Sequence, residues 1–141
     1  MKKQNRWEEL FEGWLDLTDF TLIKYKDGWG LYDKQCGNFG DIESDRFENA
    51  TQIIDRMEIY IDDYIFEDLE EELGAYKVDT EDKEIPWSAE QWLEMRKDTK
   101  FYKKNKKYFE SHKWEFDVLD MFVNHTNEIN LENVFYESEE E

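Results

Sequence analysis

The stretch TLIKYKDGWGLYD, residues 21–33, decides the fold that the sequence predicts. Residues 21–25 and 29–33 are both rich in the β-branched and aromatic types that favour strands. Between these two runs lies Lys26-Asp27-Gly28, and an Asp-Gly pair at such a place is a strong signal for a hairpin. We therefore expect two antiparallel strands joined by a tight turn.

Four of the six glycines lie between residues 28 and 40. They do not have the spacing of a dinucleotide-binding loop, because Asp33 stands where the third glycine would be, and no phosphate-binding Gly-Lys-Ser/Thr follows. Asp27, Asp33 and Asp41 do not have the spacing of a calcium-binding EF-hand loop either. The glycines are therefore interpreted as turn residues.

The hairpin is expected to extend into a small antiparallel β-meander over about residues 21–43. A second turn is expected at 35–38 and a short third strand at 39–42, because Gly37 and Asn38 again interrupt the β-prone pattern. Residues 131–136 are expected to return as a strand beside the meander.

Apolar residues spaced three and four apart predict helices over much of the remaining chain. The helices are expected after Asn5, over Asn49–Leu73, after Ser88, over Phe101–His112 and over Trp114–Asn127. A break near Asp62-Asp63 stays open, because aspartate can cap a second helix. Ser88 and Gln91 fit a capping box, and Trp87 and Trp92 fit a hydrophobic staple. The predicted fold class is α+β, with one domain over 1–136 and a disordered acidic tail over 137–141.

The charge of the chain restricts its partners. There are 37 acidic and 18 basic side chains, giving a net charge of −19. Such a field repels DNA, RNA and anionic membranes and attracts basic surfaces. Acidity that serves only solubility remains the alternative. Because no stretch approaches the ~20 apolar residues of a membrane span and the N-terminus has no signal-peptide core, a cytoplasmic location is expected.

No arrangement of residues indicates catalysis or metal binding. Cys36, His112 and His125 occur singly and far apart, without the spacing of a zinc site. With 37 carboxylates in the chain, a close acidic pair carries no information about acid–base catalysis. We therefore expect no catalytic residue, no metal and no cofactor. An enzyme or small-molecule binder with a pocket near Trp29, Tyr32 and the C-terminal helix is the alternative.

Basic residues concentrate between residues 94 and 113. A lysine stripe there consists of Lys100, Lys103, Lys104, Lys106, Lys107 and Lys113. Its lysines alternate with aromatic residues, which superficially suits nucleic-acid binding, but the surrounding negative charge opposes that. The stripe is interpreted as a solvated helix face, or as a surface that meets an acidic face in the same molecule or in a second copy.

The most suggestive feature is an acidic face on the helix predicted over Asn49–Leu73. Its members are Asp55, Glu58, Asp62, Asp63, Glu67, Asp68, Glu70, Glu71 and Glu72. Duplex DNA carries one negative charge per ~1.7 Å of axis, and an α-helix rises ~1.5 Å per residue. Carboxylates every three or four residues form a sparser version of that row, which could engage a groove built for DNA or could serve helix solvation alone.

The segment from Asp27 to Asp33, continued by Gly40–Phe47, resembles a segment of small acidic proteins from bacterial mobile elements and phages. Through this resemblance the chain is loosely similar to anti-CRISPR and related anti-defence proteins. The resemblance covers about a sixth of the chain and transfers no functional residue. It implies a small inhibitor, and several inhibitors of this kind act as DNA mimics.

The leading hypothesis is thus a non-enzymatic, acidic inhibitor that binds a basic partner through the acidic face. The expected partner is a nucleic-acid-processing enzyme such as a CRISPR nuclease, whose groove the inhibitor would block. A toxin-immunity protein is the runner-up. A homodimer joining the lysine stripe to the acidic face is a third hypothesis.

Overall fold

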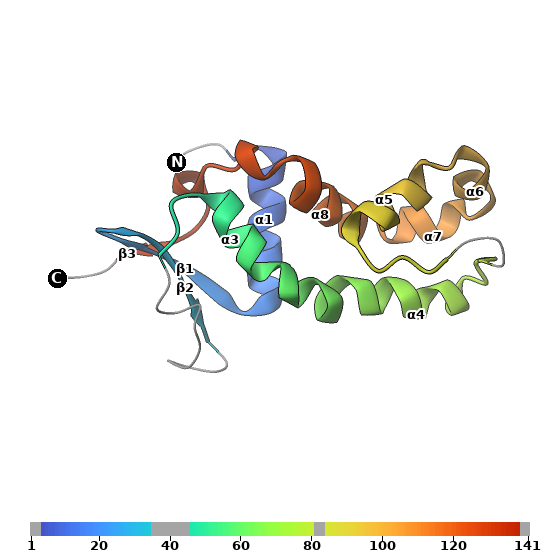
Figure 1. Cartoon of the computed structure of the whole chain (residues 1–141), viewed down its shortest axis with the longest axis horizontal. Coiled ribbons are helices and arrows are strands. Elements are labelled where there is room, and N and C mark those ends of the chain that lie inside the picture. Colours follow the sequence, from blue (N-terminus) through green and yellow to red (C-terminus); the bar gives the residue numbers. More distant parts are fainter. Residues whose placement is uncertain (1–3, 35–45, 81–83, 139–141) are drawn as a thin grey trace. The chain divides into compact units, whose positions relative to one another are not determined.

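The computed structural model describes residues 4–34, 46–80 and 84–138 (Figure 1). Helices dominate it and a small mixed sheet packs against several of them, so the predicted α+β class is confirmed. The chain forms two compact units, one from residues 1–59 with 125–141 and one from residues 60–124. Among the described residues, no helix combines the length and apolar character needed to cross a membrane.

The first unit holds the sheet and the helices nearest the chain ends. Its elements are α1 (Arg6–Thr18), β1 (Phe20–Tyr25), β2 (Gly28–Asp33), α3 (Ala50–Met57), the 3-10 turns η3 (Thr126–Glu128) and η4 (Leu131–Asn133), and β3 (Glu137–Ser138). The second unit is helical. Its elements are η2 (Asp62–Phe66), α4 (Glu67–Ala75), α5 (Ala89–Lys97), α6 (Thr99–Lys104), α7 (Lys106–Ser111) and α8 (Lys113–Asn124), and η1 (Glu58–Tyr60) joins the two units along the chain.

The predicted hairpin is confirmed. β1 and β2 pair antiparallel from Phe20 opposite Asp33 to Tyr25 opposite Gly28, and a two-residue turn joins them. The sheet has the order β2-β1-β3, with β3 parallel to β1 (Figure 1). The turn predicted at 35–38 and the strand predicted at 39–42 lie outside the described residues.

The strand predicted over 131–136 is wrong. Leu131–Asn133 form a 3-10 turn, and the third strand is Glu137–Ser138. A 3-10 turn brings side chains three apart onto one side, which lets Leu131 and Val134 both be buried. The disorder predicted for 137–141 is likewise wrong for Glu137 and Ser138, because both pair with the edge of β1.

The two glycines of the hairpin permit close packing. Gly28 has φ +139°, and a Cβ there would lie 2.9 Å from the carbonyl oxygen of Phe47. Trp29 and Phe47 exchange two 2.8 Å backbone hydrogen bonds beside it. At Gly30, a Cβ would meet the ring of Tyr25 at 2.5 Å. A side chain at either position would collide with its neighbours.

The helices of the first unit follow the predicted pattern. Asn5 caps α1, since its side chain accepts the N–H of Glu8 and the Glu8 side chain accepts the N–H of Asn5. Asn49 caps α3 by accepting the N–H of Gln52. The buried faces of both helices are mainly apolar, although α1 also buries Glu8 and Thr18. Their apolar members are Phe11, Trp14, Leu15, Ala50, Ile53, Ile54 and Met57.

The helix predicted over Asn49–Leu73 is helical along its backbone but changes its hydrogen-bond pattern. It passes from α3 through a 3-10 turn into the π-helical η2 and then into α4. Asp62 and Asp63 lie inside η2 and do not cap a new helix. The buried Ile61, Ile65, Leu69 and Leu73 are four apart, and in an α-helix each step of four turns ~40° beyond a full turn. The wider π turn offsets part of that drift.

The four remaining helices pack around large rings. Trp92, Tyr108 and Phe116 are fully buried there, and the ring pairs Trp92–Phe116 and Tyr108–Phe116 each meet edge-on at 6.3 Å. The helix predicted over Phe101–His112 ends at Asn105, whose side chain donates to the carbonyl oxygen of Phe101, and resumes as α7. α8 covers most of the helix predicted over Trp114–Asn127.

Candidate functional site

The predicted acidic face is divided between the two units. Asp55 and Glu58 belong to the first unit and the other seven side chains to the second. These seven, the 62–72 carboxylates, are Asp62, Asp63, Glu67, Asp68, Glu70, Glu71 and Glu72. All seven are exposed except Glu72, which is half-buried. Within the described part of the chain, none of the seven forms an ion pair.

The π turn of η2 affects how these carboxylates align. Asp62 and Glu67 are five residues apart, and so are Asp63 and Asp68. In an α-helix, side chains five apart point about 140° away from each other. Here the N–H of Glu67 bonds to the carbonyl oxygen of Asp62, the i→i+5 bond of a π turn, which brings such pairs towards one face. The carboxylates of α4 thus continue the row of carboxylates that begins in η2.

The lysine stripe lies on α6 and α7 and at the start of α8. It is not one uniform face, because the chain turns at Asn105. Lys104 pairs with Asp79 at 3.4 Å, while Lys103 and Lys106 line a pocket. Lys100 and Lys107 are exposed and lie outside the lining of that pocket.

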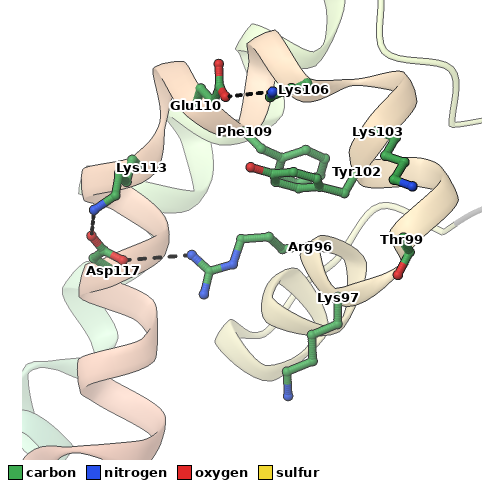
Figure 2. A pocket seen from close by; sticks show the side chains of 10 residues that line it. All are labelled: Arg96, Lys97, Thr99, Tyr102, Lys103, Lys106, Phe109, Glu110, Lys113 and Asp117. Carbon is green, nitrogen blue, oxygen red and sulfur yellow. Dashed lines mark hydrogen bonds and ion pairs between the residues drawn. The ribbon is translucent and has the colours of Figure 1, made fainter.

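The pocket has a volume of about 700 Å³ and is formed by α5 to α8 (Figure 2). Its lining side chains are Arg96, Lys97, Thr99, Tyr102, Lys103, Lys106, Phe109, Glu110, Lys113 and Asp117. The sequence shows an alternation of basic and aromatic residues here, but a pocket at this place was not predicted. Only the packing of four short helices brings Arg96 near Asp117, 21 positions later in the chain.

Asp117 organises one wall of the pocket. This side chain is almost buried, and its carboxylate oxygens lie 3.1 Å from Lys113 and 3.9 Å from Arg96. The guanidinium of Arg96 also lies 5.4 Å from the centre of the Phe116 ring. Two cations therefore lie beside one carboxylate, so this wall of the pocket carries a net positive charge.

The two histidines lie in separate units and show no metal-binding arrangement. His112 Nδ1 lies 3.0 Å from Glu115 in a contact flanked by the rings of Tyr76 and Tyr108, and its buried Nε2 has no hydrogen-bond partner among the described residues. This favours the tautomer with the proton on Nδ1. Cys36 lies outside the described residues. Among those described, no group of three or more His, Cys, Asp or Glu side chains could hold a metal ion.

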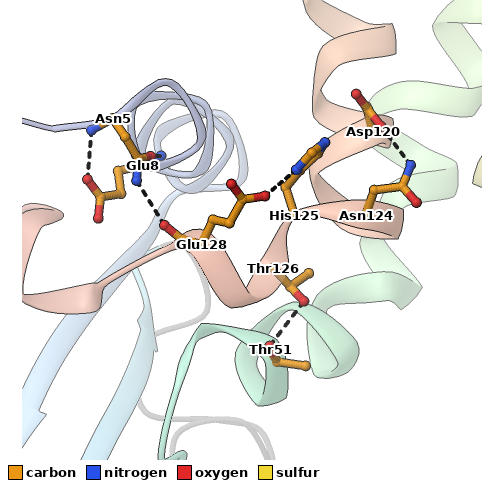
Figure 3. A network of polar contacts seen from close by, with 8 residues as sticks. All are labelled: Asn5, Glu8, Thr51, Asp120, Asn124, His125, Thr126 and Glu128. Carbon is orange, nitrogen blue, oxygen red and sulfur yellow. Dashed lines mark hydrogen bonds and ion pairs between the residues drawn. The ribbon is translucent and has the colours of Figure 1, made fainter.

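His125 belongs to a polar network in the first unit. Its ring stacks on Trp7 with centroids 3.7 Å apart, and its Nδ1 contacts Glu128. Asn5 donates to the carbonyl oxygen of Glu128 at 2.9 Å, and the Thr51 and Thr126 hydroxyls lie 3.0 Å apart (Figure 3). These contacts join α1 and α3 to residues 125–128, which is a structural role.

A pocket was expected near Trp29, Tyr32 and the C-terminal helix. Neither Trp29 nor Tyr32 lines the pocket of α5 to α8. The Trp29 ring is buried, packs edge-on against Tyr136 at 5.1 Å and lies beneath the ammonium group of Lys24 at 5.3 Å. Lys24 in turn pairs with Glu132, which raises the pKa of Lys24. Trp29 therefore closes the core beside the sheet.

Comparisons with known proteins give no relative from which a function could be transferred. No family model matches the chain, and neither the curated proteins nor the solved structures include a match.

Proposed function

We propose that this chain is a non-enzymatic protein-binding inhibitor whose 62–72 carboxylates engage a basic partner. The partner class is a nucleic-acid-processing enzyme, such as a CRISPR nuclease, and the carboxylates occupy the groove that otherwise holds nucleic acid. Such a partner places the chain in the cytoplasm.

The observation that supports this proposal most directly is the lack of counter-charges. The 62–72 carboxylates form no ion pair within the described residues, and six of the seven side chains are exposed. An unneutralised row of like charges repels itself, so it favours an external cationic surface. Charge complementarity of this kind sets partner choice and association rate more than it sets raw affinity.

The density of the row is close to that of duplex DNA. Residues 62 to 72 span about 15 Å at ~1.5 Å per residue. Duplex DNA has about nine phosphate charges over that length, at one per ~1.7 Å. Seven carboxylates over the same length supply a similar, slightly sparser set of charges, which lysine and arginine side chains in a DNA groove can contact.

Co-purification at two salt concentrations tests the proposal. Tagged protein is recovered from its host at low and at high salt, and the retained proteins are identified by mass spectrometry. We expect a basic nucleic-acid enzyme to be retained at low salt and released at high salt, because screening weakens an electrostatic contact. A basic toxin without nucleic-acid activity would instead identify an immunity protein, and no basic protein at either salt contradicts the proposal.

Charge reversal locates the surface. The test variant carries Asp63→Lys, Glu67→Lys, Asp68→Lys and Glu71→Lys. The control variant carries four reversals at exposed carboxylates elsewhere, namely Asp16→Lys, Glu48→Lys, Glu84→Lys and Glu137→Lys. Both change the net charge equally. Only the test variant is expected to lose the partner, and equal retention by both variants would remove the 62–72 carboxylates from the proposal.

A further inference from the structure

The pocket of α5 to α8 is cationic in a strongly acidic chain. Its cationic side chains are Arg96, Lys97, Lys103, Lys106 and Lys113, against the two carboxylates Glu110 and Asp117. Each carboxylate already contacts lining cations, since Glu110 lies 3.7 Å from Lys106 and Asp117 contacts Arg96 and Lys113. Lys97 also pairs with Glu94, which lies outside the lining. Five cations against these three carboxylates still leave an excess of positive charge, which a multiply charged anion would match.

The cations differ in how readily they can turn to a ligand. Lys103 forms no ion pair within the described residues. The Lys106–Glu110 pair is well exposed at both ends, and such pairs exchange partners at little cost. Lys113 and Arg96 both lie beside the carboxylate of Asp117, Lys113 at 3.1 Å and Arg96 at 3.9 Å. Arg96 and Lys113 thus lie beside a carboxylate, and Lys97 pairs with Glu94 at 3.4 Å. Lys103 and Lys106 are the two cations that can turn most readily to a ligand.

An aromatic ring forms another part of the lining. Tyr102 stacks on Phe109 with centroids 5.3 Å apart and an interplanar angle of 29°. Phe109 is buried beneath it, whereas Tyr102 is half-buried, so the ring of Tyr102 faces the pocket. Figure 2 shows Tyr102 and Arg96 extending from α6 and α5 in the same direction, towards α8. A flat ring and an anionic group of one ligand can therefore be held side by side.

From this combination we infer that the pocket binds a nucleoside phosphate. The base stacks against Tyr102, and the phosphate groups lie among Arg96, Lys103 and Lys106. Base–aromatic stacking tolerates any base because every base has a π-face. Arginine and lysine both suit phosphate, the former through its planar fork. The volume of about 700 Å³ lies within the ~300–1,000 Å³ of small-molecule sites.

Calorimetry of the full chain with four probes tests the inference. The probes are ATP, AMP, adenosine and inorganic pyrophosphate. We expect saturable binding of ATP, with adenosine and pyrophosphate each at least about tenfold weaker, because each lacks one half of the recognised group. Absence of saturable binding by every probe overturns the inference. Pyrophosphate as tight as ATP also overturns it, because the ring would then contribute nothing.

Two matched pairs of lysine variants test whether ATP binding depends on the pocket lining or only on the positive charge of α6 and α7. Lys103→Met with Lys106→Met removes two cations that line the pocket, one from α6 and one from α7. Lys100→Met with Lys107→Met removes two from the same helices outside the lining. The first pair is expected to weaken ATP binding about tenfold or more and the second less than about twofold. An equal loss of ATP affinity in both pairs would contradict a binding site in this pocket.

A variant of Tyr102 tests the proposed stacking of the base separately from the phosphate contacts. Tyr102→Leu is expected to lower the affinity for ATP to that for pyrophosphate and to leave pyrophosphate binding unchanged. Circular dichroism checks that the variant is folded. Unchanged ATP affinity in folded Tyr102→Leu overturns the assignment of the base to this ring. Because no residue of the 62–72 carboxylates lines the pocket, these results are independent of the proposed inhibitor function.

Discussion

The carboxylate of Glu8 accepts a 2.9 Å hydrogen bond from the backbone N–H of Asn130, 122 positions further along the chain. It also accepts hydrogen bonds from the backbone of Asn5 and the side chain of Asn133. Burial raises the pKa of Glu8, but the three hydrogen bonds outweigh that effect and hold the pKa below its ordinary value of 4.5. A buried charge thus joins α1 to the C-terminal segment.

Replacing this carboxylate is expected to destabilise the protein at neutral pH. In Glu8→Gln one of the two oxygens becomes an N–H₂ group facing N–H donors, which should cost about 1–3 kcal/mol of unfolding free energy. Urea unfolding at pH 7 measures the loss. Glu9→Gln, exposed on the same helix, is the control and should change stability by less than about 0.5 kcal/mol. Equal unfolding of both variants would contradict the role given to Glu8.

The same carboxylate predicts an acid limb in the stability curve. Because the folded pKa lies below the ordinary 4.5, the unfolded state takes up the proton first as the pH falls. The stabilisation from Glu8 is therefore complete above about pH 4.5 and is lost as the pH falls below it, through the folded pKa. The difference in unfolding free energy between wild type and Glu8→Gln should shrink over that range. A constant difference would show that the charge of Glu8 is not the cause.

Tyr108 predicts the opposite, alkaline limb. Its side chain is buried, and its hydroxyl donates to the carbonyl oxygen of Leu69 at 2.7 Å. Burial raises the pKa of Tyr108 well above its ordinary value of 10.0, and the charges of Glu115 and Glu72 add to that. The unfolded state therefore loses the proton first, and stability should fall as the pH rises above about 10. Tyr108→Phe should cost about 1 kcal/mol at pH 7 and flatten this limb in urea unfolding. An unchanged limb contradicts the assignment.

The hairpin and three helix starts were predicted correctly from short stretches of sequence. The Asp-Gly signal found the hairpin, and the caps at Asn5, Asn49 and Ser88 found three helix starts, because each depends on residues only a few positions apart. The α+β class followed from the change between strand-type and helix-type periods along the chain.

Features that depend on distant partners were missed. β3 forms from two polar residues because the edge of β1 is available, which no local pattern at Glu137 reports. The passage from one unit to the other falls within a continuous helical pattern, so neither composition nor a glycine or proline marks it. The pocket depends on how four helices pack, so only its charge and its rings, not its shape, could be predicted from residues 94–113.

The start of α5 separates a correct prediction from a wrong one. Ser88 accepts the N–H of Gln91 as predicted, but Trp87 is 74% exposed, so the predicted staple with Trp92 is wrong. Gln91 instead accepts the N–H of Trp87. Ser88→Ala should therefore cost about 1 kcal/mol of unfolding free energy, whereas Trp87→Ala should stay within about 0.5 kcal/mol. Thermal unfolding of the two variants measures these losses of stability. A larger loss in Trp87→Ala than in Ser88→Ala would support the predicted contact between Trp87 and Trp92.

Three glycine-to-alanine variants test whether the hairpin needs its glycines. Gly28→Ala should lose about 1–3 kcal/mol, because φ is +139° and the new Cβ would lie 2.9 Å from the rigid Phe47 backbone. In Gly30→Ala the loss should be smaller, since the Tyr25 ring can rotate away, although this gives up its 3.7 Å contact with Arg46. Gly74→Ala, with open space around it in α4, should gain about 0.4–1 kcal/mol. Urea unfolding ranks the three. Gly28→Ala as stable as Gly74→Ala would mean that the hairpin does not constrain its first glycine.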